Sequence, residues 1–385
     1  MDFDLSDDQR ALQATIREFA EAEVAPHAAA WDRDEMFPLE TVKKLGELGV
    51  MGLAFPEEYG GLGQGSLEMA IVLEELARID SSIAITVGAN VSLGGAPIAL
   101  FGTHEQKQRW LAPLARGEVL GAFGATEPQA GSDLQGTRTT AKLDGECWRI
   151  NGTKAFITNA GTPMSAFVTI TAVTGTRADG RHEISNVVVP NGTRGYTQGK
   201  PYKKLGWHAS DTRELSFDNC EVPRDHLIGP QGRGARQFLE VLDGGRVGVA
   251  ALSVGLAVGA LEQSLAYAKQ RTAFGRPIAS NQAVAFKLAD VSTEIEAARL
   301  LTYKSAALKD AGRPYARVAA QAKLFASELA VRAADHLMQI HGGYGYIEES
   351  PVPRFYRDAK ILAIGEGTSE IQRLIIARHL GCEVS

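Results

Sequence analysis

The hydrophobic pattern of this chain changes its period twice, and this restricts the fold more than any other feature. Apolar residues recur at helical spacing up to about residue 120, alternate with polar residues from there to about 228, and return to helical spacing from about 233. A chain of 385 residues is long enough for two or three domains. The pattern predicts a mainly helical α+β protein with a helical domain over 1–120, a β domain over 121–230 and a helical bundle over 231–385.

The N-terminal domain is expected to contain helices and no strand. Ser6 with Gln9, and Thr103 with Gln106, form possible capping boxes at two helix starts. Pro38 is suited to the first turn of a further helix. The expected helices run from Ser6 to about residue 30, from Pro38 onward, over 66–79, and from Thr103 to about residue 115.

The middle domain is expected to be an antiparallel barrel or sandwich. Turn residues separate its candidate strands at short intervals, as all-β domains require. The connections are too short for helical crossovers, which favours antiparallel pairing. Asn151-Gly152 and Asn191-Gly192 have the composition of hairpin turns. The candidate strands span 147–150, 154–158, 166–173, 184–189 and 212–217.

Long apolar-periodic segments in the C-terminal domain indicate an up-and-down four-helix bundle. Gly255 and Gly259 lie one turn apart and would let another helix approach closely. The most apolar run, 247–261, is shorter than the roughly 20 residues that a membrane span needs, so a buried helix is expected there. The four helices are expected over 238–273, 281–311, 316–340 and 369–380.

Composition and charge are those of an ordinary soluble enzyme. Charged residues make up 22% of the chain and hydrophobic residues 44%, and a net charge of -6 gives no electrostatic reason to expect a nucleic-acid partner. The three cysteines are far apart and odd in number, which argues against a disulfide framework. The acidic start has no apolar core after a basic region, so no signal peptide is expected. We therefore expect a cytoplasmic protein with no membrane span and no metal site.

Two motifs carry candidate chemistry. Residues 364–373 place Glu366 between Gly365 and Gly367. Glycine on both sides lets the backbone approach a ligand or adopt positive φ, and a carboxylate shielded from water becomes a stronger base. From these residues alone, a surface glutamate in a glycine turn is an equally good interpretation. The other motif, residues 124–133, is rich in turn formers and short hydroxyl side chains.

No motif indicates a nicotinamide cofactor. The glycines of 342–345 follow a helical segment and not a strand. They therefore do not match the dinucleotide-binding fingerprint, which opens a helix after a strand.

With the glycine-rich segment 339–347 between them, these two motifs make nearly the whole chain resemble the flavin-dependent acyl-CoA dehydrogenase family. The resemblance implies FAD as cofactor and the α,β-dehydrogenation of an acyl-CoA thioester to the trans-2-enoyl-CoA. Glu366 would remove the α-proton, N5 of the flavin would take the β-hydride, and the electrons would pass to an electron-transfer flavoprotein. Some relatives carry the base on a bundle helix just before an arginine, and here that position is Gly245, ahead of Arg246.

The resemblance also assigns residues to the cofactor. Thr126 would lie near the polar edge of the flavin, Phe156 against one face, and Thr158 near the reactive nitrogen. Arg271 and Gln282 would reach the cofactor of a neighbouring subunit, which implies a homo-oligomer and typically a tetramer. The full expected set is Phe123, Ala125, Thr126, Gly131, Ser132, Phe156, Ile157, Thr158, Arg271, Phe274, Gln282, Gln339, Ile340, Gly342, Gly343, Thr368 and Glu370.

These cofactor assignments have simpler alternatives. Thr126 and Thr158 could be ordinary strand threonines, and Phe156 a core residue. Arg271 could be a helix-terminal side chain that binds backbone carbonyl groups. His208 is interpreted as a packed or turn histidine that the chemistry does not need.

A second set of residues is expected at the substrate: Ser132, Asp243, Arg246 and Gly367. Ser132 would contact the CoA part, and Asp243 and Arg246 would lie near its adenosine-pantetheine portion. Arg246 could equally be a structural ion-pair partner beside the active site.

Two positions depart from the family pattern. Ala125 stands where a larger aliphatic residue is usual, which removes no hydrogen-bond donor. Gly365 stands where many straight-chain relatives have tyrosine, which leaves room for a wider or branched acyl group. The pattern is closest to short-chain and short branched-chain members, and it indicates a role in fatty acid β-oxidation.

Two other functions stay open. An oxidase of the same fold would pass its electrons to oxygen, and no sequence motif distinguishes it. A flavin- or CoA-binding scaffold without catalysis is the other alternative, and the presence of Glu366 and Arg271 counts against it.

Overall fold

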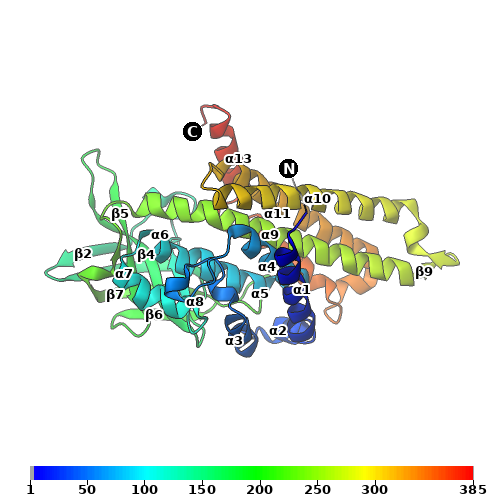
Figure 1. The fold of residues 1–385 in the computed structure, drawn as a ribbon, viewed down its shortest axis with the longest axis horizontal. Helices are drawn as coiled ribbons and strands as arrows, with labels where there is room; N and C mark the ends of the chain where they lie inside the picture. The colour runs from blue at the N-terminus through cyan, green and yellow to red at the C-terminus, as the bar shows by residue number, and fades with distance from the viewer. Residues whose placement is uncertain (1–3, 385) are drawn as a thin grey trace.

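The computed structural model describes residues 4–384, in which a sheet lies at one end and long helices extend away from it (Figure 1). The first three residues of the predicted N-terminal domain and the last residue of the C-terminal domain lie outside the described residues. The order of helices, then strands, then helices confirms the predicted fold class. The helices are α1 (Asp7–Phe19), α2 (Ala28–Asp34), α3 (Leu39–Glu47), α4 (Ser66–Ile79), α5 (Ser81–Ala89), α6 (Ala96–Phe101), α7 (His104–Gln106), α8 (Ala112–Ala115), α9 (Gly234–Gln270), α10 (Gln282–Asp310), α11 (Ala316–His341), α12 (Val352–Leu362) and α13 (Ser369–His379). The strands are β1 (Leu120–Gly124), β2 (Thr140–Asp144), β3 (Cys147–Thr158), β4 (Ser165–Thr176), β5 (His182–Pro190), β6 (Tyr196–Pro201), β7 (Thr212–Pro223), β8 (Leu227–Ile228), β9 (Thr272–Ala273) and β10 (Arg276–Pro277).

Both predicted capping boxes are present in the N-terminal helices. The Ser6 hydroxyl accepts from the backbone N–H of Gln9 at the start of α1, and Thr103 does the same for Gln106 at α7. The helix expected to reach residue 30 is divided into α1, a π-helical segment over Ala20–Val24, and α2. Pro26, which has no backbone N–H, lies in the break between them.

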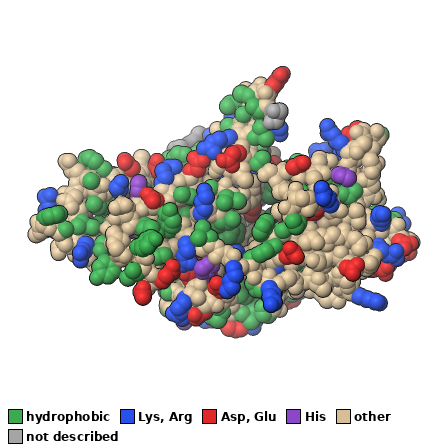
Figure 2. Space-filling model, turned by 180° about the vertical axis from the view of Figure 1, so that it is seen from behind, with side chains coloured by type: hydrophobic (Ala, Val, Ile, Leu, Met, Phe, Trp, Pro, Cys, Tyr) green, Lys and Arg blue, Asp and Glu red, His purple; other side chains and the backbone are tan. Residues whose placement is uncertain are grey.

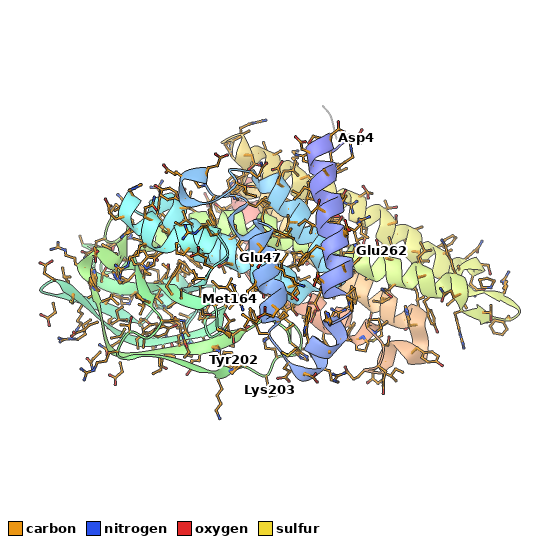
Figure 3. The ribbon with its side chains drawn as sticks, turned by 60° about the horizontal axis from the view of Figure 1, so that its bottom comes forward. Asp4, Glu47, Met164, Tyr202, Lys203 and Glu262 are labelled. Atoms are coloured by element: carbon orange, nitrogen blue, oxygen red, sulfur yellow. The ribbon has the colours of Figure 1, made fainter. Side chains whose placement is uncertain are left out.

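The N-terminal helices pack directly on the C-terminal bundle, with α4 against α9. A Cβ added to Gly255 would overlap the Glu74 carbonyl oxygen, and one added to Gly259 would overlap the Arg78 carbonyl oxygen. The two glycines therefore let the helices approach closely, as their spacing predicts. In Figure 3, α1 crosses the bundle near Glu262 of α9.

Three long helices, α9, α10 and α11, form the body of the bundle, and α12 packs on both α11 and α9. The helix predicted over 369–380 is α13, which contacts α11 and projects from the body (Figure 1). The sequence did not indicate α12. Figure 2, which shows the opposite face, has positive and negative side chains interspersed.

The eight-stranded sheet has the order β6-β7-β3-β2-β4-β5-β8, and β1 joins it beside β4. Its pairs are antiparallel except that β4 runs parallel to β1 and to the first residue of β2. Purely antiparallel pairing was therefore too simple an expectation. The β2–β3 hairpin separates β1 from β4 in the chain, so β4 pairs in parallel with β1 without a helical crossover.

Both hairpin predictions at Asn-Gly pairs were wrong. β3 continues through Asn151-Gly152, where its pairing with β7 shifts register and Gly152 has a φ of 146°. Asn191-Gly192 does form a turn, with Gly192 at a φ of 82°, but it joins β5 to β6, which are not neighbours in the sheet.

Two helical stretches among the described residues, Ser81–Phe101 and Gly234–Gln270, are long and apolar enough to cross a membrane. Most of each is buried inside the protein, at 67% and 78% of its most apolar window. The core helices of soluble proteins pass the same test, so length and composition alone are weak evidence for a span.

Candidate active site

Glu366 lies in the turn between α12 and α13, against the backbone of α9. Its φ is 51°, and that of Gly367 is 94°. Its Oε2 atom is buried and has no hydrogen-bond partner among the described residues. A Cβ added to Gly245 of α9 would overlap this Oε2, so only glycine leaves room for the carboxylate.

Two buried cations flank this carboxylate. The Lys323 side chain from α11 is fully buried, and its Nζ donates to the Gly367 carbonyl oxygen at 2.7 Å. Gln372 donates to the same carbonyl oxygen at 2.8 Å, so the turn is held from two helices. Arg246 is buried next to Gly245 and pairs with Asp243, and its Nε has no partner among the described residues.

Burial and the neighbouring positive charges shift the pKa of Glu366 in opposite directions. Burial raises the pKa of its carboxyl to about 7, while the charges of Lys323 and Arg246 oppose this rise. Burial in turn lowers the pKa of Lys323 to about 8, against the attraction of Glu366. A carboxylate with a pKa near neutral and an unpartnered oxygen is suited to act as a general base.

Sequence reasoning missed Lys323 and Gln372. A signal for Lys323 was available, because it lies among buried alanines of the helix predicted over 316–340. A lysine at a core position of an amphipathic helix must have a partner, and such residues are uncommon. Gln372 lies one turn into α13 and carries no comparable signal.

The second motif forms a loop that is fixed onto β3. The Lys154 side chain is fully buried, and its Nζ contacts Glu127 Oε1 at 2.7 Å and the Ala125 carbonyl oxygen at 3.2 Å. The backbone N–H of Ala155 donates to the Thr126 carbonyl oxygen at 2.9 Å. The structure thus brings Thr126 next to the segment that contains Phe156. Neither member of the Glu127–Lys154 pair was identified from the sequence.

Phe156 is not a core residue. Its φ is 61°, its side chain is 64% exposed, and its ring centroid lies 5.2 Å from that of Tyr202, which Figure 3 labels beside the sheet. The hydroxyl groups of Thr126, Ser132 and Thr158 have no hydrogen-bond partner among the described residues. An exposed ring in a strained backbone and free hydroxyl groups fit a flat ligand with a polar edge.

Other predicted members of the same cluster lie differently. Ile157 is buried in the core of the sheet, so only its backbone is available to a ligand. The Phe123 ring stacks on Phe238 of α9 with centroids 4.9 Å apart, and Ala125 is buried in the same cluster. Gly131 is exposed in the loop.

Helix α9 relates this cluster to Glu366. Phe238 precedes Gly245 by seven residues, which is two turns or about 10 Å along the helix axis. The loop of the second motif and the carboxylate are therefore separated by a distance that one ligand can span.

A further group of predicted cofactor residues lies at the other end of α9. Arg271 is the C-cap residue of α9, about 39 Å along the helix axis from Gly245, and the fully exposed Phe274 lies between β9 and β10. His341 stacks on Tyr267 near the same end, at 4.1 Å between ring centroids. The neighbouring residues at this end are Gln282, Gln339, Ile340, Gly342 and Gly343. One chain does not bring this group to Thr126 or Glu366.

The start of α13 holds the last two predicted cofactor residues. The Thr368 hydroxyl caps the helix by accepting from the backbone N–H of Ile371, and Glu370 is exposed. The capping role of Thr368 is structural, and its contact with a cofactor stays a prediction.

A surface cavity opens near Asp243. It has a volume of about 500 Å³ and is lined by 312–318 and by His379 of α13. A Cβ added to Gly244 would lie 3.2 Å from Lys309 Nζ and 4.0 Å from the hydroxyl of Tyr315, which lines the cavity. The cavity is thus adjacent to the residue that precedes Gly245.

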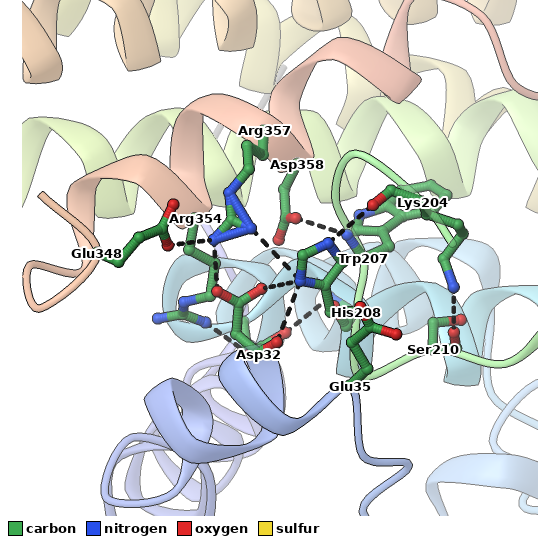
Figure 4. Close-up of polar contacts among 12 residues, drawn as sticks. Asp32, Glu35, Lys204, Trp207, His208, Ser210, Glu348, Arg354, Arg357 and Asp358 are labelled. Carbon is green, nitrogen blue, oxygen red and sulfur yellow. Dashed lines mark hydrogen bonds and ion pairs between the residues drawn. The ribbon is translucent and has the colours of Figure 1, made fainter. Parts of the chain in front are cut away.

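A polar junction joins the loop after β6 to α2 and α12 (Figure 4). His208 Nδ1 lies 3.0 Å from Asp32 Oδ1, and this contact raises the pKa of His208 to about 9. Arg357 of α12 binds Asp32 Oδ2 at 2.5 Å, and Asp358 accepts from the backbone N–H of Trp207 at 2.7 Å. His208 is therefore a charged packing residue, as the sequence interpretation has it.

Fold and site together define a class of protein, a helical protein with an inserted sheet and a buried, unpartnered carboxyl oxygen where α9 meets the α12–α13 turn. Family models for the acyl-CoA dehydrogenase N-terminal, middle and C-terminal domains match residues 6–118, 122–220 and 232–381. The chain belongs to the acyl-CoA dehydrogenase family.

Curated relatives match over almost the whole length. A probable acyl-CoA dehydrogenase of Bacillus subtilis is 50% identical over 99% of this chain and 100% of the relative. A short-chain specific acyl-CoA dehydrogenase of Clostridium acetobutylicum is 45% identical over 98% of this chain and 99% of the relative.

Solved structures of similar proteins also match over almost the whole of this chain. Butyryl-CoA dehydrogenase from Megasphaera elsdenii has a TM-score of 0.95 at 42% identity, covering 99% of this chain and 100% of that chain. A chain from a structure of the electron transferring flavoprotein of Acidaminococcus fermentans has a TM-score of 0.95 at 44% identity, covering 99% of both chains. An acyl-CoA dehydrogenase complexed with FAD from Bacillus anthracis has a TM-score of 0.92 at 34% identity, covering 98% of this chain and 67% of that chain. This chain is a flavin-dependent oxidoreductase with FAD as its cofactor.

Proposed function

We propose that this protein dehydrogenates short acyl-CoA thioesters between the α and β carbons, with Glu366 as the base that removes the α-proton. The observation that carries the proposal is the buried, unpartnered Oε2 of Glu366 against Gly245. Burial raises the pKa of this carboxyl to about 7, which makes it an effective proton acceptor at neutral pH. The positive charges of Lys323 and Arg246 keep the ionised form accessible.

FAD, when bound, supplies the hydride acceptor that no protein side chain can provide. The free hydroxyl groups of Thr126 and Thr158 would orient its polar edge, and the exposed Phe156 ring would cover one face. The group at the far end of α9, with Arg271 and Phe274, would serve the cofactor of a neighbouring subunit in a homotetramer. This group lies far from Thr126 within one chain, which supports its assignment to the cofactor of a neighbouring subunit.

The cavity over 312–318 would hold the nucleotide end of CoA. Arg313 and Arg317 line it, and guanidinium groups suit the phosphate groups of CoA. From there the pantetheine arm would pass Tyr315 and Gly244 to place the thioester at Glu366.

The wider setting follows from the family. We infer that electrons pass to an electron-transfer flavoprotein and that the enzyme works in cytoplasmic fatty acid β-oxidation. The bacterial relatives and the structural match to a chain from an electron transferring flavoprotein structure support this. We also infer that the chain divides into domains over 1–120, 121–230 and 231–385.

An anaerobic panel of acyl-CoA thioesters tests the proposal. Purified protein with bound FAD is mixed with propionyl-, butyryl-, isobutyryl- and octanoyl-CoA while the flavin absorbance is followed. We expect bleaching with the short thioesters and formation of the 2-enoyl-CoA. Bleaching that turns over in air with hydrogen peroxide would instead identify an oxidase. A protein without FAD, or with FAD that no thioester bleaches, would contradict the proposal.

A further inference from the structure

Two glycines mark a space between helices that are otherwise buried. Gly88 is half-buried, while the other eight residues of α5 are fully buried. Gly248 of α9 is half-buried as well, while its neighbours over 245–247 and 249–257 are fully buried. Solvent therefore reaches the interior at these two positions.

The side chain of Leu73 from α4 lies across this space. A Cβ added to Gly88 would be 3.5 and 3.7 Å from the two δ carbons of Leu73, and one added to Gly248 would be 3.2 Å from Cδ1. No other heavy atom lies within 4 Å at either position once chain neighbours are set aside. Leu73 is 2% exposed, so its two methyl groups close the space between α5 and α9.

The space begins next to the catalytic carboxylate. Gly248 follows Gly245 by three residues, so the two lie on adjacent turns of one helix face, about 4.5 Å apart along the axis. Gly245 contacts Glu366, and Gly244 leads in the other direction to Tyr315 and the cavity proposed for CoA. An acyl chain whose α-carbon is at Glu366 and which runs along this face of α9 would pass Gly248 and meet the Leu73 side chain there.

Leu73 is held firmly in this position. The carboxylate of the next residue, Glu74, accepts from Arg299 Nη2 at 2.8 Å and from the Tyr303 hydroxyl at 3.0 Å, both on α10. Its carbonyl oxygen lies against Gly255 of α9. Because α4 is fixed to both bundle helices at this point, Leu73 cannot move aside as a rigid part of its helix.

We propose that Leu73 ends the acyl cavity and limits the enzyme to short acyl chains. The proposal rests on the function proposed above and specifies its substrate class. A longer straight chain would have to displace the two methyl groups of Leu73 from a closely packed site. One methylene group too many or too few in an apolar pocket changes kcat/KM by roughly 10- to 200-fold.

The test compares Leu73→Ala with Leu76→Ala in the FAD-loaded enzyme. Leu76 is the matched control. It is a fully buried leucine one turn further along α4, and it lies towards the part of α9 in which every residue is buried. The measurement is kcat/KM for butyryl-CoA and for octanoyl-CoA with an artificial electron acceptor. We expect the octanoyl-to-butyryl ratio to rise by at least about tenfold in Leu73→Ala and to stay at the wild-type value in Leu76→Ala.

Two further variants keep the test decisive. Leu73→Val is expected to shift the ratio in the same direction by a smaller factor, and it serves if Leu73→Ala does not fold. Leu73→Phe is expected to lower kcat/KM for butyryl-CoA more than for propionyl-CoA.

An unchanged ratio in a folded Leu73→Ala or Leu73→Val enzyme would overturn the assignment. An equal rise in Leu76→Ala would do the same, since it would indicate general loosening of α4. Failure of the proposed function looks different, because the wild-type flavin would then be bleached by no acyl-CoA at all.

Discussion

The buried carboxyl groups of two glutamates in this protein have opposite surroundings. Glu127 contacts Lys154 at 2.7 Å and accepts from the backbone N–H groups of Arg138 and Thr139. These partners hold the pKa of Glu127 below its usual range in spite of burial. Glu366 has an unpartnered oxygen, and burial raises its pKa to about 7.

Burial alone therefore does not decide the role of a carboxylate. Where hydrogen bonds and an ion pair satisfy it, as at Glu127, the charge is stabilised and the group fastens a loop to β3. Where one oxygen is left free beside more distant cations, as at Glu366, the group keeps its affinity for a proton. Only the second arrangement is suited to proton abstraction.

The largest expected effect comes from Glu366→Gln, which keeps the shape of the side chain and removes the base. The rate of flavin reduction by butyryl-CoA should fall by about 10²- to 10⁴-fold. Glu47→Gln is the control, since Glu47 is exposed on α3 and lies outside the predicted cofactor and substrate sets, so its replacement should leave the rate unchanged within a factor of a few. Reduction at the wild-type rate in Glu366→Gln would remove the base assignment.

Glu366→Gln should lower the activity but raise the stability of the folded protein. The folded-state pKa of Glu366 lies above that of an unfolded glutamate, so ionisation at Glu366 opposes folding as the pH rises towards and through 7. Thermal unfolding should therefore show Glu366→Gln to be more stable than the wild type at pH 8 and equal to it near pH 4.

Glu127→Gln should give the next largest effect, on stability and not primarily on the chemical step. It leaves Lys154 buried without a counter-charge, which typically costs about 3–5 kcal/mol of unfolding free energy. Glu221→Gln removes half of an exposed pair with Arg149 and should cost less than about 1 kcal/mol. Equal losses by denaturant unfolding would contradict the contrast between Glu127 and an ordinary surface pair.

The smallest expected effect concerns Lys323→Met. The wild-type kcat/KM should rise with pH through about 7, because the base must be ionised. Removing the charge of Lys323 takes away a factor that lowers the pKa of Glu366, so the rise should move to higher pH. A purely structural role would instead reduce kcat/KM by the same factor at every pH, and Lys323→Arg should keep the wild-type profile.

The fold could be predicted from the sequence wherever one face of an element is buried. The periods of α10 and α11 gave their bounds closely, because buried residues recur along each of them at helical spacing between exposed ones. β1 and α5 were missed because they are buried all round and show no period. The register shift in β3 at Gly152 was missed because an Asn-Gly pair has the same composition in a hairpin turn and in a bulge.

The motifs of the candidate site could be predicted from the sequence, but the residues from other helices that contact them could not. Glu366 was accessible because its flanking glycines and its resemblance to a family motif are local features of the sequence. Lys323 is recognisable as a lysine at a core position, but its contact with the Gly367 carbonyl group joins segments far apart in the chain, as the contacts of Leu73 with Gly88 and Gly248 do, and no local pattern specifies such contacts. Gly245 could be seen as an empty position, but only the packing of α9 against the α12–α13 turn gives the reason for it.

The continuity of α9 has a consequence for how this site can vary. Phe238, Gly245 and Gly248 lie on one unbroken helix, so the count of residues fixes their separations and loop conformation has no influence. Inserting or deleting one residue between 238 and 248 would turn everything beyond it by about 100° and withdraw one of these contacts. This segment should therefore accept exchanges of side chains while being intolerant of any change in length.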